Sequence, residues 1–576
     1  MAITALLVFQ FFGIAQTPTK GEELEDFVST SFEYESHESI TLSSQWDFEY
    51  KNGVVSGLGT VDDPYIIEGY EISNTETAIE LDGTSVYYVI RNVYIHDTES
   101  TAIKLSGSVH GKIINCRIEN NQGYGIRIEN SEDTVFSNNV ITGNTDGGIN
   151  ITNAQGNVIS DSVIDGNGGA GIELDNSQGN TITNNSISEN AKHGVYLSNG
   201  AQGNTISKNT VRGNDKTGLY MNAGDSNEIT YNSFEENNKG VYIEAGANNM
   251  IHHNSFIDNI ERQAFEAYTG TESGDQWDDG SEGNHWSNYT GSDSDNDGIG
   301  DEPYIINSIA GVIEIKDNYP LMEPINTKPT AIITSPQCIV SGEVTLRGYA
   351  FDDQGVEKVE VKIEGKGWVE VDVSGKEWTF SLDTTQVDDG FTEVSVRAHD
   401  GSEYSEDVSV EGFVIANKEE SENPTVSNID IDVDGDTTKI EVSAEDNTQI
   451  AKVEIWVDGE LRGVDKYAPY TWEGKGSEET KAVAFDIYGN QDETSQQVDG
   501  DGGGGEDDGE GSILDPMGFA FYVIPIIIIA LIGVGLLYRK NKDTSREAVE
   551  PRTERTREEK PREKDTRNKE PPEPPQ

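Results

Sequence analysis

The sequence predicts an all-β protein: a parallel β-helix, then two β-sandwiches and one C-terminal transmembrane helix. Three observations carry this prediction. A phrase recurs about every 23 residues between 67 and 265, two later segments alternate cleanly between apolar and polar residues, and a stretch near the C-terminus has no charge. A chain of 576 residues is also long enough for several domains.

The repeat has two anchors that keep the same period. One opens an Ile-x-x-Asn-x-Ile phrase and recurs at Ile67, Ile90, Ile113, Phe136, Ile159, Ile182, Ile206, Ile229 and Ile251. The other usually follows Gly or Ala and recurs at Ile79, Ile103, Ile126, Ile149, Ile172, Val195, Leu219, Val241 and Phe265. Short period-2 pieces around both anchors indicate strands rather than helices. We therefore predict about nine stacked coils, about 43 Å in length, with the anchors inside.

Asparagine is the third constant of the repeat. We expect Asn144, Asn167, Asn190, Asn214 and Asn237 to stack at one corner of the coils and to satisfy turn backbone there, which is a structural role. Cys116 stands where other copies carry Asn and is expected to be a buried small residue. The adjacent His252 and His253 are expected to be a turn feature, and a metal-binding role is the much less favoured alternative.

The β-helix is expected over residues 31–323, with the residues before 67 and after 267 capping its two ends. Residues 1–30 are expected to hold a signal or leader segment, because the apolar run from Ala2 to Ala15 is too short to span a membrane.

Two further all-β segments follow. Residues 327–416 contain Val356–Ile363 and Trp378–Leu382, which alternate as strands between turn clusters. Residues 422–498 repeat this plan in a shorter form. We expect a β-sandwich in each, neither with a disulfide pair. The Gly- and acid-rich residues 499–515 are expected to form a flexible stalk.

Residues 519–538 are expected to cross a membrane. The 20 residues carry no charge and would span about 30 Å as a helix. Acidic residues precede them, whereas Arg539 and Lys540 follow directly. The positive-inside rule then places residues 539–576, expected to be disordered, in the cytoplasm and the larger part of the chain outside the cell. The expected location is the cell membrane, with a single pass.

Composition narrows the choice of partners. The net charge is −65 and the pI about 4.2, so nucleic acid is not expected as a partner. Such acidity keeps a protein soluble by self-repulsion and is typical of a salty habitat. An acidic surface that binds polycations or Ca²⁺ is the alternative.

The repeat resembles the NosD-like right-handed parallel β-helix of the carbohydrate-binding and sugar-hydrolase superfamily. The phrases before and after the repeat, Gly57–Ile72 and Gly283–Asp301, also resemble the ends of archaeal β-helix surface proteins. The two sandwich segments resemble bacterial immunoglobulin-like surface modules, which implies spacing or adhesion. The copper-related role evoked by the family name is not expected, because the chain has no Met/His cluster or Cys site for copper.

An Asp-rich loop is the sharpest chemical motif. Carboxylates at Asp293, Asp295, Asp297 and Asp301, with Gly298 at the sixth position, are what an oxygen-ligand Ca²⁺ loop requires, and the Ile299 carbonyl fits the seventh position. Tyr304 replaces the usual Glu at position twelve, so Asp317 or Glu302 would have to complete the site. An acidic turn without metal is the alternative.

An outward position between the inward residues of the second anchor predicts a ligand surface. It is occupied on successive coils by Glu80, Lys104, Arg127, Asn150, Glu173, Tyr196, Tyr220 and Tyr242. Tyr196, Tyr220 and Tyr242 would form a flat aromatic strip suited to sugar CH groups, with Arg127 or Glu173 meeting polar groups. Ordinary packing between coils is the alternative.

Catalysis is the less favoured hypothesis. Glu173 and Asp175 share one outward strand face and could act as a glycosidase pair. Lys104 and Arg127 are the basic candidates for a lyase.

Taken together, the domains, the membrane span and the outward row predict a membrane-anchored surface protein that binds polysaccharide or surface glycoprotein. The alternatives are a polysaccharide lyase or glycoside hydrolase, and a purely structural envelope component.

Overall fold

The computed structural model describes residues 34–44, 47–267, 274–309, 314–335, 339–418, 421–434, 437–466, 468–475 and 479–497. The predicted leader, stalk, membrane span and tail lie outside these ranges, as does Cys338. Within them, no helix is long and apolar enough to cross a membrane. The helices described are short 3-10 turns, η2 (Tyr50–Asn52) and η3 (Thr384–Gln386).

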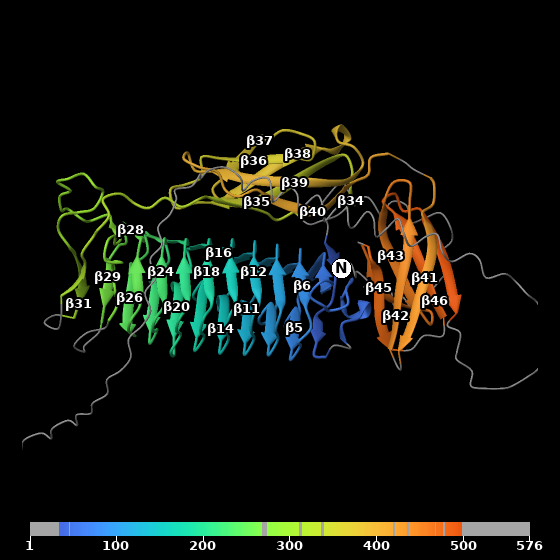
Figure 1. Cartoon of the computed structure of the whole chain (residues 1–576), viewed down its shortest axis with the longest axis horizontal. Coiled ribbons are helices and arrows are strands. Elements are labelled where there is room, and N and C mark those ends of the chain that lie inside the picture. The colour runs from blue at the N-terminus through green and yellow to red at the C-terminus, as the bar shows by residue number, and fades with distance from the viewer. Residues whose placement is uncertain are drawn as a thin grey trace, which may run out of the picture. The chain divides into compact units, whose positions relative to one another are not determined.

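Residues up to 317 form the predicted parallel β-helix, in which successive coils add strands to three sheets (Figure 1). The first sheet contains β1 (Glu35–Ser36), β4 (Tyr70–Ser73), β7 (Tyr94–His96), β10 (Arg117–Glu119), β13 (Val140–Thr142), β16 (Val163–Asp165), β19 (Ser186–Ser188), β22 (Thr210–Arg212), β25 (Ser233–Glu235), β28 (Ser255–Ile257) and β30 (His285–Trp286). The second contains β2 (Ile40–Leu42), β5 (Ile79–Asp82), β8 (Ile103–Ser106), β11 (Tyr124–Glu129), β14 (Gly147–Thr152), β17 (Ile172–Asp175), β20 (His193–Ser198), β23 (Thr217–Asn222), β26 (Lys239–Ala245), β29 (Arg262–Glu266), β31 (Tyr304–Ser308) and β32 (Ile315–Asp317). The third contains β3 (Tyr65–Glu68), β6 (Tyr88–Arg91), β9 (Gly111–Ile114), β12 (Val135–Ser137), β15 (Val158–Ser160), β18 (Thr181–Thr183), β21 (Thr205–Ser207), β24 (Glu228–Thr230) and β27 (Met250–His252).

The first anchor of the repeat is confirmed throughout. Its members pair in register along the third sheet, from Ile67 against Ile90 to Ile229 against Ile251, and all are buried. Since equivalent side chains stack on successive coils, burial of one apolar position per coil fills the bore. The nine strands described in this sheet agree with the predicted coil number.

The second anchor is confirmed as far as Val241 and fails at the last coil. There Val241 pairs with Ala264, and Phe265 pairs with the outward Tyr242. Phe265 is therefore not an inward anchor. The spacing between the last two anchors misled the prediction, because a shift of one residue along a strand turns a side chain to the opposite face.

The asparagines form three buried rows rather than one. The predicted row runs from Asn121 through Asn144, Asn167, Asn190, Asn214 and Asn237 to Asn259. The second holds Cys116, Asn139, Ser162, Asn185, Asn209, Asn232, Asn254 and Asn284, and the third runs from Asn157 to Asn249. In each row a side-chain oxygen accepts the backbone N–H of the previous coil, so the turns stay satisfied without water.

Two of the rows end on an acceptor from the exit segment, and the predicted row ends on Gln263 of β29, within the last coil. Asp275 Oδ1 accepts from Asn249 N at 2.7 Å, Asp317 Oδ2 accepts from Asn284 N at 2.7 Å, and Gln263 Oε1 accepts from Asn259 Nδ2 at 2.6 Å. The last asparagine of a row has no following coil to bind. These three side chains therefore supply the hydrogen bonds that the next coil would have made.

Aromatic rings close the C-terminal end of the bore. Phe256 stacks on Trp286 at 4.3 Å between ring centroids, and Trp286 stacks on Tyr304 at 4.1 Å. Trp286 and Trp277 are both buried. Beyond them, β31 continues the second sheet, and β32 pairs with it in the antiparallel direction. Large rings thus replace the aliphatic ladder where the stacking of coils ends.

The two later segments are all-β, as predicted. The first comprises β33 (Thr330–Ile333), β34 (Ile339–Val340), β35 (Glu343–Phe351), β36 (Lys358–Ile363), β37 (Val369–Ser374), β38 (Glu377–Asp383), β39 (Gly390–His399) and β40 (Val408–Ile415), joined in one continuous sheet around the buried Trp378. The second comprises β41 (Thr425–Asp434), β42 (Thr437–Glu445), β43 (Ile450–Val457), β44 (Glu460–Asp465), β45 (Tyr470–Lys475), β46 (Glu479–Asp486) and β47 (Gln491–Gln497), in sheets of three and four strands. In the first, β37 pairs with both β36 and β38, which joins what would otherwise be two layers.

Candidate functional site: an outward aromatic row and an acidic loop

The predicted outward row exists on the second sheet. Strand register pairs Glu80 with Lys104, Lys104 with Arg127, Arg127 with Asn150, Asn150 with Glu173, Glu173 with Tyr196, Tyr196 with Tyr220, and Tyr220 with Tyr242. Phe265 extends the aromatic part to four rings. All four aromatic side chains are half-buried. The row therefore presents polar and charged groups on its early coils and aromatic groups on its late coils.

The rings stack on one another instead of lying flat on the surface. Tyr196 and Tyr220 have centroids 5.2 Å apart and planes 16° apart, and Tyr242 and Phe265 stack at 5.2 Å and 20°. Rings lying side by side in one plane cannot approach so closely, because their edges would collide. Tyr220 and Tyr242 are tilted by 51° at 5.6 Å. The flat strip expected from the sequence is therefore wrong in its geometry: the row offers ring edges and hydroxyl groups.

His193 lies beside the aromatic row and was not singled out in the sequence. Its ring stacks on Tyr220 at 4.6 Å, and its Nδ1 is buried without a hydrogen-bond partner. Burial, followed by the charges of Lys216, Lys192 and Lys239, lowers the pKa of His193 to about 4. The imidazole is therefore neutral at neutral pH. Strict alternation would turn His193 inward, because it stands two residues before the inward anchor Val195, so the sequence pattern gave no signal for this position.

A staggered row of lysines lies beside the rings, in which Lys239 pairs with Thr217 and so shares the register of His193 rather than that of Lys192. Lys216 N donates to Lys192 O at 2.8 Å, and Lys239 N donates to Lys216 O at 2.9 Å, so the three lie on successive coils. The Lys239 ammonium lies 5.6 Å from the centroid of Tyr242, and the Arg262 guanidinium lies 4.6 Å from that of Phe265. Lys239 and Arg262 are both ion-paired with Glu261, at 3.1 Å and 2.7 Å, so the positive charge beside the rings rests chiefly on Lys192 and Lys216.

Tyr220 is fixed by a carboxylate. Its hydroxyl group donates a hydrogen bond to Glu244, which is exposed. Burial, together with this bond and the charge of Glu244, raises the pKa of Tyr220 well above its usual range. Tyr220 is therefore a neutral donor, and its ring is held between neighbours on both sides.

Glu173 lies at the junction of the polar and aromatic parts. Its Oε2 accepts from the Tyr124 hydroxyl at 3.1 Å and from Asn150 Nδ2 at 3.2 Å. Burial, followed by the charge of Glu173, raises the pKa of Tyr124 to about 12. Asp175, the second predicted carboxylate, binds elsewhere: its Oδ1 accepts from Asn199 Nδ2 at 2.6 Å. The structure thus commits the two carboxylates to separate hydrogen-bond networks.

The predicted basic candidates are paired with acids. Lys104 lies 2.7 Å from Glu80, and Arg127 lies 2.6 Å from Glu129. The hydrogen bond to Glu80 is the main cause that raises the pKa of Lys104. Lys104 therefore stays protonated and cannot take a proton from a substrate at neutral pH, and a guanidinium cannot do so either.

The Asp-rich loop brings three of its carboxylates together. Ligand atoms of Asp293, Asp295 and Asp297 all lie within 4.8 Å of one another. Backbone N–H groups of the loop donate to the Asp293 carboxylate: Oδ1 accepts from Asn296 N at 2.8 Å, and Oδ2 accepts from Gly298 N at 3.0 Å. The three residues are thus placed by the Asx-type turn that the Asp and Gly spacing encodes.

The other predicted ligands are used differently. Asp301 Oδ2 accepts from Ser294 Oγ at 2.7 Å and from Ser292 Oγ at 3.0 Å, and the first of these lowers the pKa of Asp301 most. Asp297 Oδ1 accepts from Ile299 N at 2.9 Å, a bond that does not involve the predicted ligand atom, the Ile299 carbonyl oxygen, whose role stays a prediction. Asp317 cannot complete the loop, because its carboxylate is buried between Asn284 N and Trp286 Nε1.

Family comparison agrees with this architecture. Residues 77–227 and 199–274 match the family described as right handed beta helix region, and residues 329–396 and 426–483 match the bacterial Ig domain. No curated protein sequence matches the chain.

Several solved structures are similar to parts of the chain. A periplasmic alginate epimerase shares 13% identity over 35% of this chain and 65% of its own, less than two thirds, with a TM-score of 0.23. The A-module of a mannuronan C-5 epimerase from Azotobacter vinelandii shares 13% over 46% of this chain and 92% of its own, at 0.32. Tailspike protein 2 of bacteriophage CBA120 shares 9% over 83% and 73%, at 0.33. Strand pairing and the family matches together show that the chain combines a right-handed parallel β-helix with two bacterial immunoglobulin-like domains.

Proposed function

We propose that this protein is a membrane-anchored surface protein that binds anionic polysaccharide, or the glycan of a surface glycoprotein, along the aromatic row of its β-helix. The observation that carries the proposal is the lysine row Lys192, Lys216 and Lys239 beside the rings Tyr196, Tyr220 and Tyr242. Anchoring through residues 519–538, with a NosD-like head outside the cell, belongs to the same proposal and rests on the sequence.

The chemistry of the row supports an anionic, linear ligand. Equivalent side chains recur at every coil, about 4.8 Å apart, so one polymer could meet the same groups repeatedly. Ammonium groups attract carboxylate or sulfate, while tyrosine hydroxyls and ring edges suit sugar hydroxyl groups. Because the rest of the chain is strongly acidic, an anionic polymer would be repelled elsewhere and attracted here.

Affinity electrophoresis of the full chain in gels containing a polyuronate, a sulfated polysaccharide or a neutral glucan tests this proposal. We expect retention by the anionic polymers and its weakening by salt. The double variant Lys192→Gln/Lys216→Gln should lose most of the retention. The matched control, Lys112→Gln/Lys208→Gln, changes the same charge away from the aromatic row and should behave as wild type. Equal retention of the two double variants would reject the lysine row as the binding surface.

A polysaccharide lyase or glycoside hydrolase is the second candidate, and the hydrogen bond between Tyr124 and Glu173 favours it. Binding is preferred, because Lys104 and Tyr124 both hold their protons at neutral pH and Asp175 is engaged elsewhere. Formation of unsaturated uronate or of new reducing ends, lost in Glu173→Gln, would establish catalysis instead. An envelope component with a purely structural role is the third candidate, and the absence of retention by any of the polymers would support it.

We also propose that the loop of Asp293, Asp295 and Asp297 binds Ca²⁺ weakly. The three carboxylates lie close together on an exposed turn. Asp301 would have to leave Ser292 and Ser294 to join them, which favours low affinity.

A further inference from the structure

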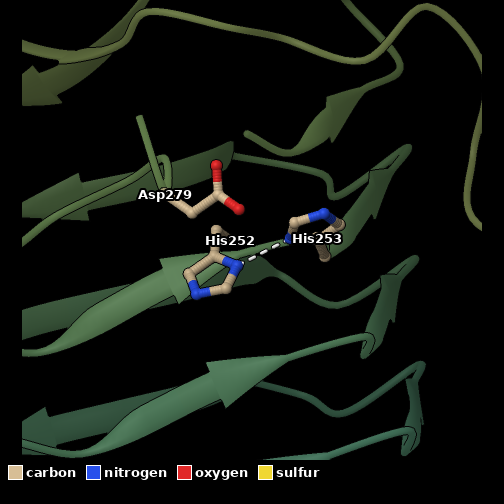
Figure 2. Close-up of side chains that lie close together, drawn as sticks. All are labelled: His252, His253 and Asp279. Atoms are coloured by element: carbon tan, nitrogen blue, oxygen red, sulfur yellow. Dashed lines mark hydrogen bonds between the residues drawn. The ribbon is translucent and has the colours of Figure 1, made fainter. Parts of the chain in front are cut away.

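A second group of potential metal ligands lies at the C-terminal end of the β-helix, away from the Asp-rich loop. His252, the last residue of β27, and the adjacent His253 lie close to Asp279, which belongs to the exit segment (Figure 2). The two Nδ1 atoms are 2.6 Å apart, and one ligand atom of each of the three residues lies within 4.8 Å of the others. The sequence separates Asp279 from the histidines by 26 residues, so only the fold joins them.

The backbone holds the three side chains in place. His253 has a left-handed conformation, φ 54°, as do Lys208 and Tyr231 at the same corner of the preceding coils. This turn lets adjacent histidines direct their rings to one point. Asp279 is fixed by its own Asx turn, since its Oδ1 accepts from Ser281 N and Glu282 N, both at 2.8 Å. The site therefore does not depend on an unordered side chain.

The two segments are also tied directly to each other. His253 N donates to Gly283 O at 2.7 Å, and His253 Nε2 lies 2.9 Å from Glu282 Oε2. A carboxylate that accepts from Nε2–H leaves the lone pair of His253 on Nδ1, the atom that faces His252. Such carboxylate–histidine pairs orient the imidazole ligands of metals in many proteins.

We propose that His252, His253 and Asp279 form a binding site for a divalent transition metal of the Zn²⁺ class, with the remaining coordination positions open to water. Imidazole nitrogen prefers Zn²⁺, Ni²⁺ and Cu²⁺ over Ca²⁺ and Mg²⁺, which prefer oxygen. The metal replaces the proton now shared by the two Nδ1 atoms, and His252 then carries its proton on Nε2. Tetrahedral bonds of about 2.0 Å place the two nitrogens about 3.3 Å apart, so the rings separate slightly on binding.

The site links the last complete coil to the exit segment. β27 ends the third sheet, and Asp279 belongs to the segment that supplies Asp275 to the end of the third asparagine row. A bound metal therefore fastens the end of the β-helix, and it should raise the stability of that end by mass action. This role is independent of polysaccharide binding along the aromatic row.

Titration of the untagged full chain with Zn²⁺, in high salt and excess Ca²⁺ to occupy the acidic surface, tests the proposal. We expect one site per chain and, with Co²⁺, visible absorption bands of a nitrogen-ligated ion. Binding should weaken by tenfold or more in His252→Gln, His253→Gln and Asp279→Asn, the last of which retains the Asx-turn acceptor and so the fold. Glu282→Gln, which removes only the orienting carboxylate, should cause a smaller loss than any of these three ligand variants.

His110→Asn is the matched control. His110 also has a left-handed backbone, φ 60°, but stacks on Tyr87 away from this site, and its replacement should leave Zn²⁺ affinity unchanged. The proposal would be overturned if Asp279→Asn and the double variant His252→Gln/His253→Gln both bound Zn²⁺ as tightly as the wild type. Surface carboxylates alone would then be responsible for the binding. Titrations without saturable binding would also overturn the proposal.

Discussion

Replacement of Asn139 tests whether the asparagine rows stabilise the β-helix through hydrogen bonds. Asn139 is fully buried; its Oδ1 accepts from Cys116 N at 3.0 Å, and its Nδ2 donates to Ile113 O at 2.8 Å. Asn139→Ala leaves both backbone groups buried without these partners. At about 1–3 kcal/mol for each, the local free energy of opening should fall by about 4 kcal/mol. That is about a thousandfold increase in the open population.

Asn139→Ser is the matched control, because the same row already contains a serine. Ser162 Oγ accepts from Asn139 N at 3.1 Å and donates to Ser160 O at 2.7 Å. A serine at 139 should likewise accept from Cys116 N and lose only the bond to Ile113. We therefore expect a loss of about 2 kcal/mol, or about 30-fold in the open population.

The buried thiol of Cys116 provides the assay. Burial raises its pKa to about 12, so the folded coil does not react with alkylating reagents and labelling requires opening. When reclosing is faster than labelling, the labelling rate follows the open population. Mass spectrometry of peptides separates Cys116 from Cys338. Equal labelling rates in the Ala and Ser variants, or a rise of under about threefold in Asn139→Ala, would refute the reasoning.

Three further predictions concern the exit segment. Burial raises the pKa of Asp317 to about 6, so the folded chain keeps a proton that the unfolded chain releases from about pH 4 upwards. The free energy of unfolding should then fall by about 3 kcal/mol as the pH rises from 4 to 6. Calorimetry should show no such fall in Asp317→Asn. Wild type and variant losing the same stability over this pH range would contradict the prediction. Gly283→Ala should lower the melting temperature of the β-helix, because a Cβ would lie 1.8 Å from Asp317 Oδ1. Gly280→Ala is the control: its Cβ position has open space around it, so it should lower the melting temperature far less despite its left-handed backbone. Similar losses in the two variants would exclude the clash as the cause. Ca²⁺ at millimolar concentration should raise the melting temperature of the wild type but not that of Asp293→Asn, and no shift in the wild type would exclude the Ca²⁺ site.

Much of the fold could be predicted from the sequence, because every coil of a β-helix has to meet the same two physical requirements. Each coil must bury an apolar residue at the same place and satisfy the same turn. The roles of Ile159 and Asn190 can therefore be assigned from the period alone. The prediction failed at the last coil: Phe265 is predicted as an inward anchor, but the pairing keeps the 23-residue step, which places Ala264 inward and Phe265 outward.

The site was only partly readable, since pattern does not give side-chain orientation or long-range partners. The repeat register predicted that Tyr196, Tyr220 and Tyr242 lie in one row. Only packing decides whether their rings lie flat or stack on one another. They stack, because equivalent residues are one strand spacing apart. The partners of the predicted catalytic groups were equally invisible. Glu173 is held by Tyr124, which lies two coils away.

By itself, the sequence determined the coil, its period, the buried anchors and the all-β character of the later domains, because these follow from local alternation repeated many times. Only the tertiary structure decided how the asparagine rows end on Asp275, Asp317 and Gln263, and how Asp279 reaches His252 and His253. The contacts of Asp275, Asp317 and Asp279 join residues of the coils to an exit segment that has no repeat, whereas Gln263 of β29 binds Asn259 within the last coil. No local rule specifies them, since they arise from the need to satisfy buried groups where the last coil has no successor.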